Sequence, residues 1–239
     1  MESTGYITLS RQAGLQLEMQ VVANNIANAS TTGFRAEGVI FSEYVKPVER
    51  GASLSMGQAN IGKTLFEQGG LRQTNSTFDF AIEGDGYFLI QTPLGDRLSR
   101  AGAFSPDAEG QLVTPDGFPV LDAGRAPLFV PAGAGTLAVS SDGTLSVEGV
   151  PLGQMAIVRP LDPLNMIRED GVMFRADGGD EPAEDARVMQ GFIEGSNVNP
   201  LLELTRMIEV QRAYEMGQSF LQTEDERIRA AVKTLTDSN

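Results

Sequence analysis

Hydrophobic positions recur at helical spacing near the beginning of the chain. Leu15, Met19, Val22 and Ile26 alternate at intervals of four and three residues, which places them on one stripe of an α-helix. Residues 28–33 are rich in Asn, Ser, Thr and Gly, which favour turns. The pattern therefore predicts an amphipathic helix over residues 4–29 that ends in a turn.

A second helical pattern stands at the other end of the chain. Apolar or aromatic residues repeat there every seven positions: Met207, Tyr214, Leu221, Ile228 and Leu235. Pro200 suits the first position of a helix, and Asn199 suits the N-cap before it. A helix over residues 200–235 would be about 50 Å long, more than a small domain covers. We therefore expect part of it to pack on something other than the chain's own core.

The middle of the chain, residues 51–191, has short alternating runs separated by Gly and Pro. Residues 78–82 alternate like a half-buried strand, residues 84–86 read as a turn, and residues 87–90 read as a second strand. This arrangement predicts a β-hairpin and, with the turns that follow, an antiparallel β domain such as a sandwich or open barrel. The further turn signals lie at residues 107–110, 116–117, 142–143 and 178–179.

These patterns predict an α+β fold in which long terminal helices flank a central, mostly antiparallel β domain. The two stripes are natural partners in a coiled coil. The alternative is that both helices only close an ordinary core, as amphipathic helices usually do. The expected division is a helix and Asn-rich turn at 1–34, an extended connection at 35–77, the β domain at 78–190 and a helical segment at 191–239.

Composition narrows the possible functions. The chain has 239 residues, 41% of them hydrophobic, and a net charge of −14, which argues against nucleic acid or an anionic membrane as a partner. It has no Cys, His or Trp, so disulfides, thiolate chemistry and His-based catalysis or metal binding are excluded. The polar start and the lack of a long apolar run predict neither a cleavable signal peptide nor stable membrane insertion.

Motifs that could carry chemistry are weak. Residues 84–86 read Gly-Asp-Gly, but a strand follows them and no Lys-Ser/Thr pair is present, so a turn fits better than a phosphate loop. Residues 107–110 and 177–180 lack the ligand spacing of a calcium loop. A carboxylate pair of a glycosidase could come from an acidic set: Glu67, Asp79, Glu83, Asp85, Asp96 and Asp107. We predict no catalytic residue, no cofactor and no metal ligand.

Several segments resemble bacterial flagellar axial proteins, the rod and hook family. VANNIANASTTGF at 22–34 is similar to the N-terminal signature of that family, and QGFIEGSNVNP at 190–200 to the segment leading into its terminal helix. IEVQRAYE at 208–215 continues the second match. FAIEGDGYF at 80–88 and RAGAFS at 100–105 extend the resemblance through the middle of the chain.

The resemblance implies a structural subunit of the basal-body rod that self-assembles through its terminal helices into the axial tube that crosses the periplasm and transmits torque. Expected partners are copies of itself, other rod proteins and the flagellar type III export apparatus, which exports family members with the N-terminus kept. Phe41 and Val45 resemble the Phe-x-x-x-aliphatic pattern by which early export substrates meet the export gate.

Two sets of residues are expected to make the assembly interface, because stripes, helix-end amides and turns combine in them. The N-terminal set is Leu15, Met19, Val22, Asn24, Asn25, Ile26, Asn28, Thr31, Thr32, Gly33 and Phe34. The C-terminal set is Gly195, Asn197, Asn199, Pro200, Leu204, Met207, Tyr214, Leu221 and Ile228. Two other classes remain open: a carbohydrate-acting enzyme on the β domain, and an adaptor whose helices bind one partner helix.

Overall fold

The computed structural model describes residues 2–46, 54–131 and 135–236. The chain forms two compact units and passes between them four times. The helical unit contains residues 1–29, 36–65 and 198–239. The β unit contains residues 30–35 and 66–197. Among the described residues, no helix is both long enough and apolar enough to cross a membrane.

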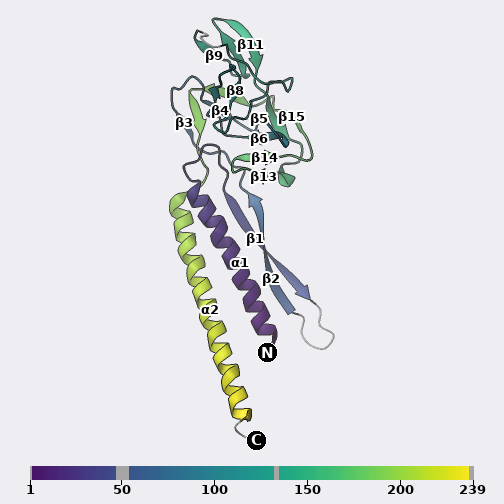
Figure 1. The fold of residues 1–239 in the computed structure, drawn as a ribbon, viewed down its shortest axis with the longest axis vertical. Helices are drawn as coiled ribbons and strands as arrows, with labels where there is room; N and C mark the ends of the chain where they lie inside the picture. The colour runs from purple at the N-terminus through teal and green to yellow at the C-terminus, as the bar shows by residue number, and fades with distance from the viewer. Residues whose placement is uncertain (1, 47–53, 132–134, 237–239) are drawn as a thin grey trace. The chain divides into compact units, whose positions relative to one another are not determined.

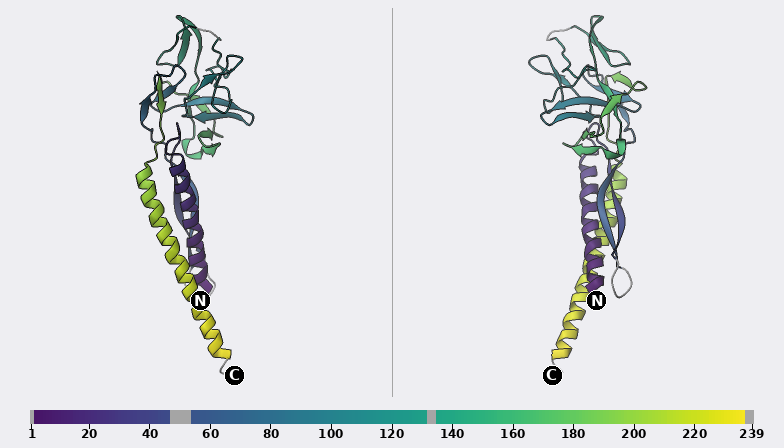
Figure 2. Two further views of the ribbon diagram at one scale, coloured as in Figure 1. Left: turned by 60° about the vertical axis from the view of Figure 1, so that its left-hand side comes forward. Right: turned by 90° about the vertical axis from the view of Figure 1, so that its right-hand side faces the viewer.

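The helical unit consists of two helices and one hairpin. In Figure 1, α1 (Glu2–Ala27) lies between α2 (Pro200–Thr236) and the hairpin of β1 (Glu37–Lys46) and β2 (Leu54–Thr64). The hairpin is antiparallel, with a register irregularity after Gly38. The views in Figure 2 also show α1 and α2 side by side, and residue 12 pairs with 214 while residue 18 pairs with 206, so the helices are antiparallel.

The predicted bounds of both helices agree with the structure to within about two residues. Asn199 caps α2 as expected, because its Oδ1 accepts hydrogen bonds from the amides of Leu201 at 3.1 Å and Leu202 at 3.3 Å. At the end of α1 the Asn28 side chain donates to the carbonyl of Asn24 at 2.9 Å. The start of α2 and the end of α1 are thus capped by polar side chains from the adjoining sequence.

The α+β class agrees with the structure, but the prediction of coiled-coil-forming terminal helices is wrong. A coiled coil needs apolar residues along its seam. In this pair the contact carries Gln12, whose Nε2 donates to the carbonyl of Tyr214 at 2.9 Å, and Glu18, which lies 2.6 Å from Arg206. α1 also buries a second face on the hairpin, where Asn25 bonds to the backbone of Glu37. The helices therefore meet through polar as well as apolar residues, and α1 buries two faces. A single apolar stripe on each helix does not account for these contacts.

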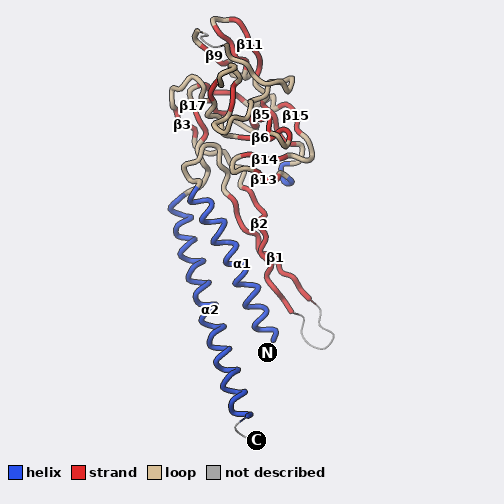
Figure 3. Tube along the Cα trace, viewed as in Figure 1, coloured by secondary structure: helices blue, strands red, loops and turns tan. Residues whose placement is uncertain are grey.

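The β unit consists of short antiparallel strands, drawn in red in Figure 3. Its largest sheet has the order β13 (Ile167–Glu169), β14 (Met173–Arg175), β6 (Gly95–Ser99), β5 (Tyr87–Thr92), β12 (Ile157–Pro160) and β15 (Asp180–Pro182). A second sheet contains β11 (Val150–Gln154), β10 (Thr144–Val147) and β9 (Leu137–Val139). The paired strands are β16 (Arg187–Gln190) with β4 (Phe80–Glu83), β17 (Phe192–Glu194) with β3 (Leu71–Gln73), and β7 (Ser105–Pro106) with β8 (Leu112–Val113).

Strand β5 is buried on both faces. Phe88 and Ile90 point into one apolar cluster, and Tyr87 and Leu89 point into another. This burial explains the uninterrupted apolar run of β5, since a strand covered on both sides has no need for polar alternation. β5 is therefore the central strand of the unit.

The predicted hairpin over residues 78–90 is wrong. β4 pairs with β16, whereas β5 pairs with β6 and β12, so the two segments belong to different sheets. Gly84, with φ of 95°, carries the chain from one sheet to the other. Residues 78–82 alternate in polarity, which predicted a half-buried strand. In the structure residues 80–82 are all buried, so the alternation does not mark an exposed face. The four other turn signals are confirmed, each by a glycine of positive φ: Gly110, Gly117, Gly143 and Gly179.

Candidate assembly interface

Helix α2 carries an exposed apolar surface. Among the described side chains of α2, only that of Val210 is buried, at 5% exposure. Large apolar side chains on the rest of the helix are 43–72% exposed: Leu201, Leu202, Leu204, Ile208, Met216, Phe220, Ile228 and Val232. Exposed apolar surface on this scale is typical of a contact with another protein.

The predicted C-terminal residues are distributed over both units. Met207, Tyr214 and Leu221 are half-buried, while Leu204 and Ile228 are exposed. Asn199 and Pro200 are exposed at the start of α2. Gly195 and Asn197 lie in the β unit and are half-buried. The structure thus gathers the helix residues on one element but does not bring the whole set together.

The predicted N-terminal residues are also divided. Leu15 and Val22 are buried inside the helical unit, Met19 and Ile26 are half-buried, and Asn24 is exposed. Asn25 is 1% exposed, and its amide exchanges two hydrogen bonds with Glu37, at 2.8 and 3.0 Å. Its role inside the chain is therefore to hold α1 on β1. A role in assembly stays a prediction for every residue of the set.

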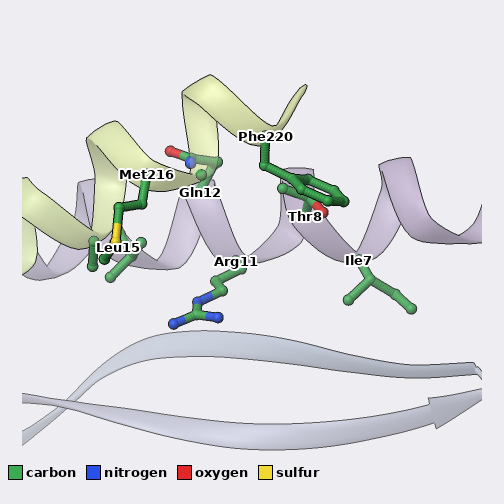
Figure 4. A pocket seen from close by; sticks show the side chains of 9 residues that line it. Ile7, Thr8, Arg11, Gln12, Leu15, Met216 and Phe220 are labelled. Atoms are coloured by element: carbon green, nitrogen blue, oxygen red, sulfur yellow. The ribbon is translucent and has the colours of Figure 1, made fainter. Parts of the chain in front are cut away.

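An open apolar groove of about 390 Å³ lies between α1 and α2 (Figure 4). Met216 and Phe220 point from α2 toward Leu15 and Thr8 of α1, and Gln12 points from α1 toward α2. Gly217 lies against Gln12: a Cβ there would lie 1.9 Å from Nε2 of Gln12, so a larger residue would displace that side-chain amide. The groove has the size and lining to accept apolar side chains of another protein.

A buried charge cluster ties distant parts of the β unit together. Glu194 is 0% exposed and pairs with Arg35, also 0% exposed, through Oε1, and with Arg100 through Oε2 at 3.1 Å. Glu194 Oε1 also accepts a hydrogen bond from the amide of Gly69 at 2.9 Å. Arg100 in turn donates to the carbonyls of Ile82 and Gly84, at 3.2 and 2.6 Å. We call Arg35, Arg100 and Glu194 the junction cluster.

The junction cluster also carries cation–π contacts and shifted pKa values. The Arg100 guanidinium lies 5.1 Å from the ring centre of Tyr87. Burial raises the pKa of the Tyr87 phenol, an effect that the nearby Arg100 opposes. Burial lowers the pKa of Arg100, and Glu194 opposes that shift. Outside the cluster, Arg168 stacks on Phe34 at 4.7 Å and on Phe174 at 4.9 Å.

The turn that follows α1 is part of this junction. The Gly33 amide donates to the carbonyl of Glu194 at 2.8 Å, and the Phe34 side chain is fully buried. The Asn197 amide donates to the carbonyl of Phe34 at 3.3 Å, and the Asn197 side chain donates to the carbonyl of Glu67 at 2.9 Å. Thr31 and Thr32 remain half-exposed beside them. The N-terminal and C-terminal motifs therefore meet inside one unit.

The sequence did not identify Arg35, Arg100 and Glu194 as functional residues. All three lie in or beside segments that carried the family resemblance, at 22–34, 100–105 and 190–200. The available signal was a charged residue flanked by apolar or small neighbours, as in Phe34-Arg35-Ala36 and Ile193-Glu194-Gly195. That signal could not have paired them, because 159 positions separate Arg35 from Glu194.

The acidic residues considered for catalysis have structural roles or are exposed. Asp96 pairs with Arg125 at 2.7 Å, and Asp107 accepts hydrogen bonds from the amides of its own turn. Glu67, Glu83 and Asp85 are exposed. Within the described ranges, no three His, Cys, Asp or Glu side chains gather as a metal site would require.

Phe41 and Val45 can be placed only by their backbones. Both lie in β1, paired with Ala59 and Ser55 of β2. Their side chains lie outside the part of the chain that the structure describes.

Family models match the chain in three places. They are described as "Flagella basal body rod protein" at residues 6–35, "Flagellar hook protein FlgE/F/G D1 domain" at residues 81–147, and "Flagellar basal body rod FlgEFG protein C-terminal" at residues 189–234. The first and third matches contain the two motifs that meet at the junction cluster, and the second contains β5 and all of β4 except Phe80.

Relatives of the chain match over its whole length. The chain is 37% identical over 245 residues to the flagellar basal-body rod protein FlgF of Caulobacter vibrioides, covering 100% of both chains. It is 37% identical to FlgF of Mesorhizobium japonicum, covering 98% of both. It is 33% identical to the rod protein FlgG of Bacillus subtilis, covering 95% of this chain and 97% of that one. The chain belongs to the flagellar basal-body rod protein family.

Proposed function

We propose that this protein is a structural subunit of the flagellar rod, of the FlgF type, which assembles with other rod proteins and with copies of itself. The observation that carries the proposal is the exposed apolar surface of α2, from Leu201 to Val232, in a chain that is 37% identical to FlgF proteins over its whole length. An exposed apolar surface of this extent is typical of a contact with another protein, because covering it removes apolar area from water. In the rod, the subunit would contribute to the axial structure that crosses the periplasm and transmits torque.

Three observations favour the FlgF type over the FlgG type. Identity to the FlgF relatives is 35–37%, against 28–33% for the FlgG relatives. The stretch from Phe41 to Phe78 is shorter than is usual in distal rod proteins. The chain also lacks the Trp that is expected near the start of a distal rod protein. The FlgG type is the second candidate.

Assembly of this kind uses two different surfaces of each subunit. Heterologous contacts that are related by a helical operation do not close on themselves and therefore produce a tube or filament segment. The groove between α1 and α2 shares Met216 and Phe220 with the exposed apolar surface of α2. We propose that this combined apolar surface makes one of the contacts, and that it needs no catalytic group.

The test is genetic and structural. A strain without this gene is expected to stop swimming and to lack a complete rod, and the full-length gene is expected to restore both. Tagged protein should appear in purified basal bodies at the position of the rod. A deletion strain that swims normally with intact rods would refute the proposed function.

Export through the flagellar type III apparatus is a finer part of the proposal. Phe41 and Val45 supply the candidate gate motif, and the N-terminus would be kept. Phe41→Ala is expected to leave the protein inside the cell at normal abundance while reducing the exported fraction, with Phe78→Ala as a control outside the motif. Unchanged export of Phe41→Ala would remove the gate assignment, and N-terminal sequencing of rod-bound protein would reveal any cleavage.

A further inference from the structure

The junction cluster contains more positive than negative charge in a region closed to water. Two guanidinium groups, of Arg35 and Arg100, share the single carboxylate of Glu194, and all three side chains are at most 3% exposed. Buried charges are expensive unless they are paired and hydrogen-bonded. Glu194 is therefore the group on which both arginines depend.

Glu194 also organises the backbone around it. Its Oε1 accepts from the Gly69 amide at 2.9 Å, and its carbonyl accepts from the Gly33 amide at 2.8 Å. The Gly195 amide donates to the carbonyl of Gly70 at 2.9 Å. One residue thus joins the segment directly after α1, the segment before β3 and the segment leading to α2.

We propose that Glu194 is a positioning residue for rod assembly, because its cluster with Arg35 and Arg100 holds the motif segments 30–35 and 194–197 in the conformation that presents Thr31 and Thr32 to a neighbouring subunit. This inference rests on the proposed function. Thr31 and Thr32 are half-exposed, whereas the residues that follow them, from Gly33 to Arg35, are buried against the cluster. Assembly contacts on the turn then depend on a charge that never reaches the surface.

The alternative is that the cluster only stabilises the β unit. A second glutamate in the same unit provides a matched control, because Glu169 also lies between two arginines, Arg97 at 2.6 Å and Arg175 at 2.5 Å. Glu169 is 24% exposed and lies on β13, at the edge of the large sheet. The chemistry of the two sites is similar, but only Glu194 bonds to the motif segments.

The first arm of the test measures amide hydrogen exchange in the purified full-length protein. In Glu194→Gln, the amides of Gly33, Gly69 and Gly195 are expected to exchange at least about tenfold faster, while those of β5 and β6 stay protected. Glu169→Gln should leave the three junction amides unchanged. Uniformly faster exchange across the β unit, or an equal effect of Glu169→Gln, would overturn the positioning role.

Arg35 variants keep the test informative even if Glu194→Gln is unstable. Arg35→Met leaves one guanidinium facing one carboxylate, so its melting temperature should fall less than that of Glu194→Gln, for which a drop of about 10 °C is expected. The double variant Arg35→Met/Glu194→Gln should recover part of that drop. Its Gly33 amide should still exchange fast, because positioning is lost even where the charge balance improves. A double variant with wild-type exchange at Gly33 would overturn the proposal.

The second arm measures incorporation into rods in cells. The double variant is expected at normal cellular abundance but at less than about one tenth of the wild-type amount in purified basal bodies, whereas Glu169→Gln incorporates normally. Wild-type incorporation of the double variant would overturn the positioning role while leaving the rod function intact. Normal swimming of the deletion strain would instead refute the rod function, without affecting the exchange result.

Discussion

The backbone around the junction cluster is packed so closely that one added Cβ atom can destabilise the fold. Gly69 and Gly70 are adjacent, but a Cβ on Gly69 would lie 2.1 Å from the carbonyl oxygen of Gly195, whereas a Cβ on Gly70 would meet nothing within 4 Å. A backbone oxygen cannot move aside as the end of a flexible side chain can. Position 69 must therefore be glycine for steric reasons, whereas position 70 has room for a side chain.

We expect Gly69→Ala to lower the free energy of unfolding by about 2 kcal/mol or more, because overpacking forces the backbone to shift. Gly70→Ala should change it by less than about 0.5 kcal/mol. Chemical denaturation of the two purified variants would measure both values. Equal stability of the two variants would show that the close approach of residues 69 and 195 does not exist.

Two neighbouring asparagines in the N-terminal motif are expected to differ in the same way. Asn25 is buried and exchanges two hydrogen bonds with Glu37, whereas Asn24 is exposed. Asn25→Ala should cost about 1–3 kcal/mol, since it removes both hydrogen bonds between the buried Asn25 side chain and the backbone of Glu37. Asn24→Ala should cost less than about 0.5 kcal/mol in the free protein. Urea unfolding checks the pair, and a larger cost for Asn24→Ala would contradict the packing of α1 on β1.

At the scale of elements, α2 has residues of two kinds. Its buried residues stabilise the subunit, and its exposed apolar residues are the ones we propose for contacts with partners. Over 37 residues it is about 55 Å long, whereas α1 with 26 residues is about 39 Å long. α1 cannot cover the whole of its partner helix. Each large apolar side chain of α2 that becomes fully buried in an assembly would contribute about 1.5–3 kcal/mol.

This division predicts opposite phenotypes for two positions on the same helix. Leu204→Gln, at a side chain 52% exposed, should leave the melting temperature nearly unchanged but reduce swimming and incorporation into rods. Val210→Ala, at a side chain 5% exposed, should lower the stability of the free protein by about 1–3 kcal/mol. Thermal melts and soft-agar swimming of both variants measure the two effects. Normal rod incorporation of Leu204→Gln would argue against this face as an assembly surface.

At the scale of the whole molecule, stability should respond to alkaline pH through Tyr87. Burial raises the pKa of its phenol in the folded chain above the ordinary value of 10.0, so the ionised form is less favourable when folded than when unfolded. The contribution of the neutral Tyr87 phenol to the free energy of unfolding is fully present below pH about 10. It is lost as the pH rises through the folded-state pKa. Unfolding free energy measured between pH 8 and about 11 should therefore decline, and Tyr87→Phe should decline less steeply. An equally steep decline in Tyr87→Phe would assign the effect to other groups.

Local signals in the sequence determined the elements that depend on near neighbours. Asn199 and Pro200 define the start of α2, and each of the four turn signals beyond residue 106 contains a glycine of positive φ. Caps and turns are decided within a few residues, so their chemistry is visible in the sequence. The family motifs at 22–34 and 190–200 were visible for the same reason.

Pairing between distant segments was decided only by the tertiary structure. The sequence could not show that β4 pairs with β16 and not with β5, or that α1 packs on a hairpin as well as on α2 through Gln12 and Glu18. Nor could it show that the two motifs meet at Glu194. A stripe or an alternating run specifies that a face is buried but not what covers it, because hydrophobic burial has no direction of its own. The sequence by itself thus determined the terminal helices, the turns and the family, and the fold alone decided which residues work inside the subunit.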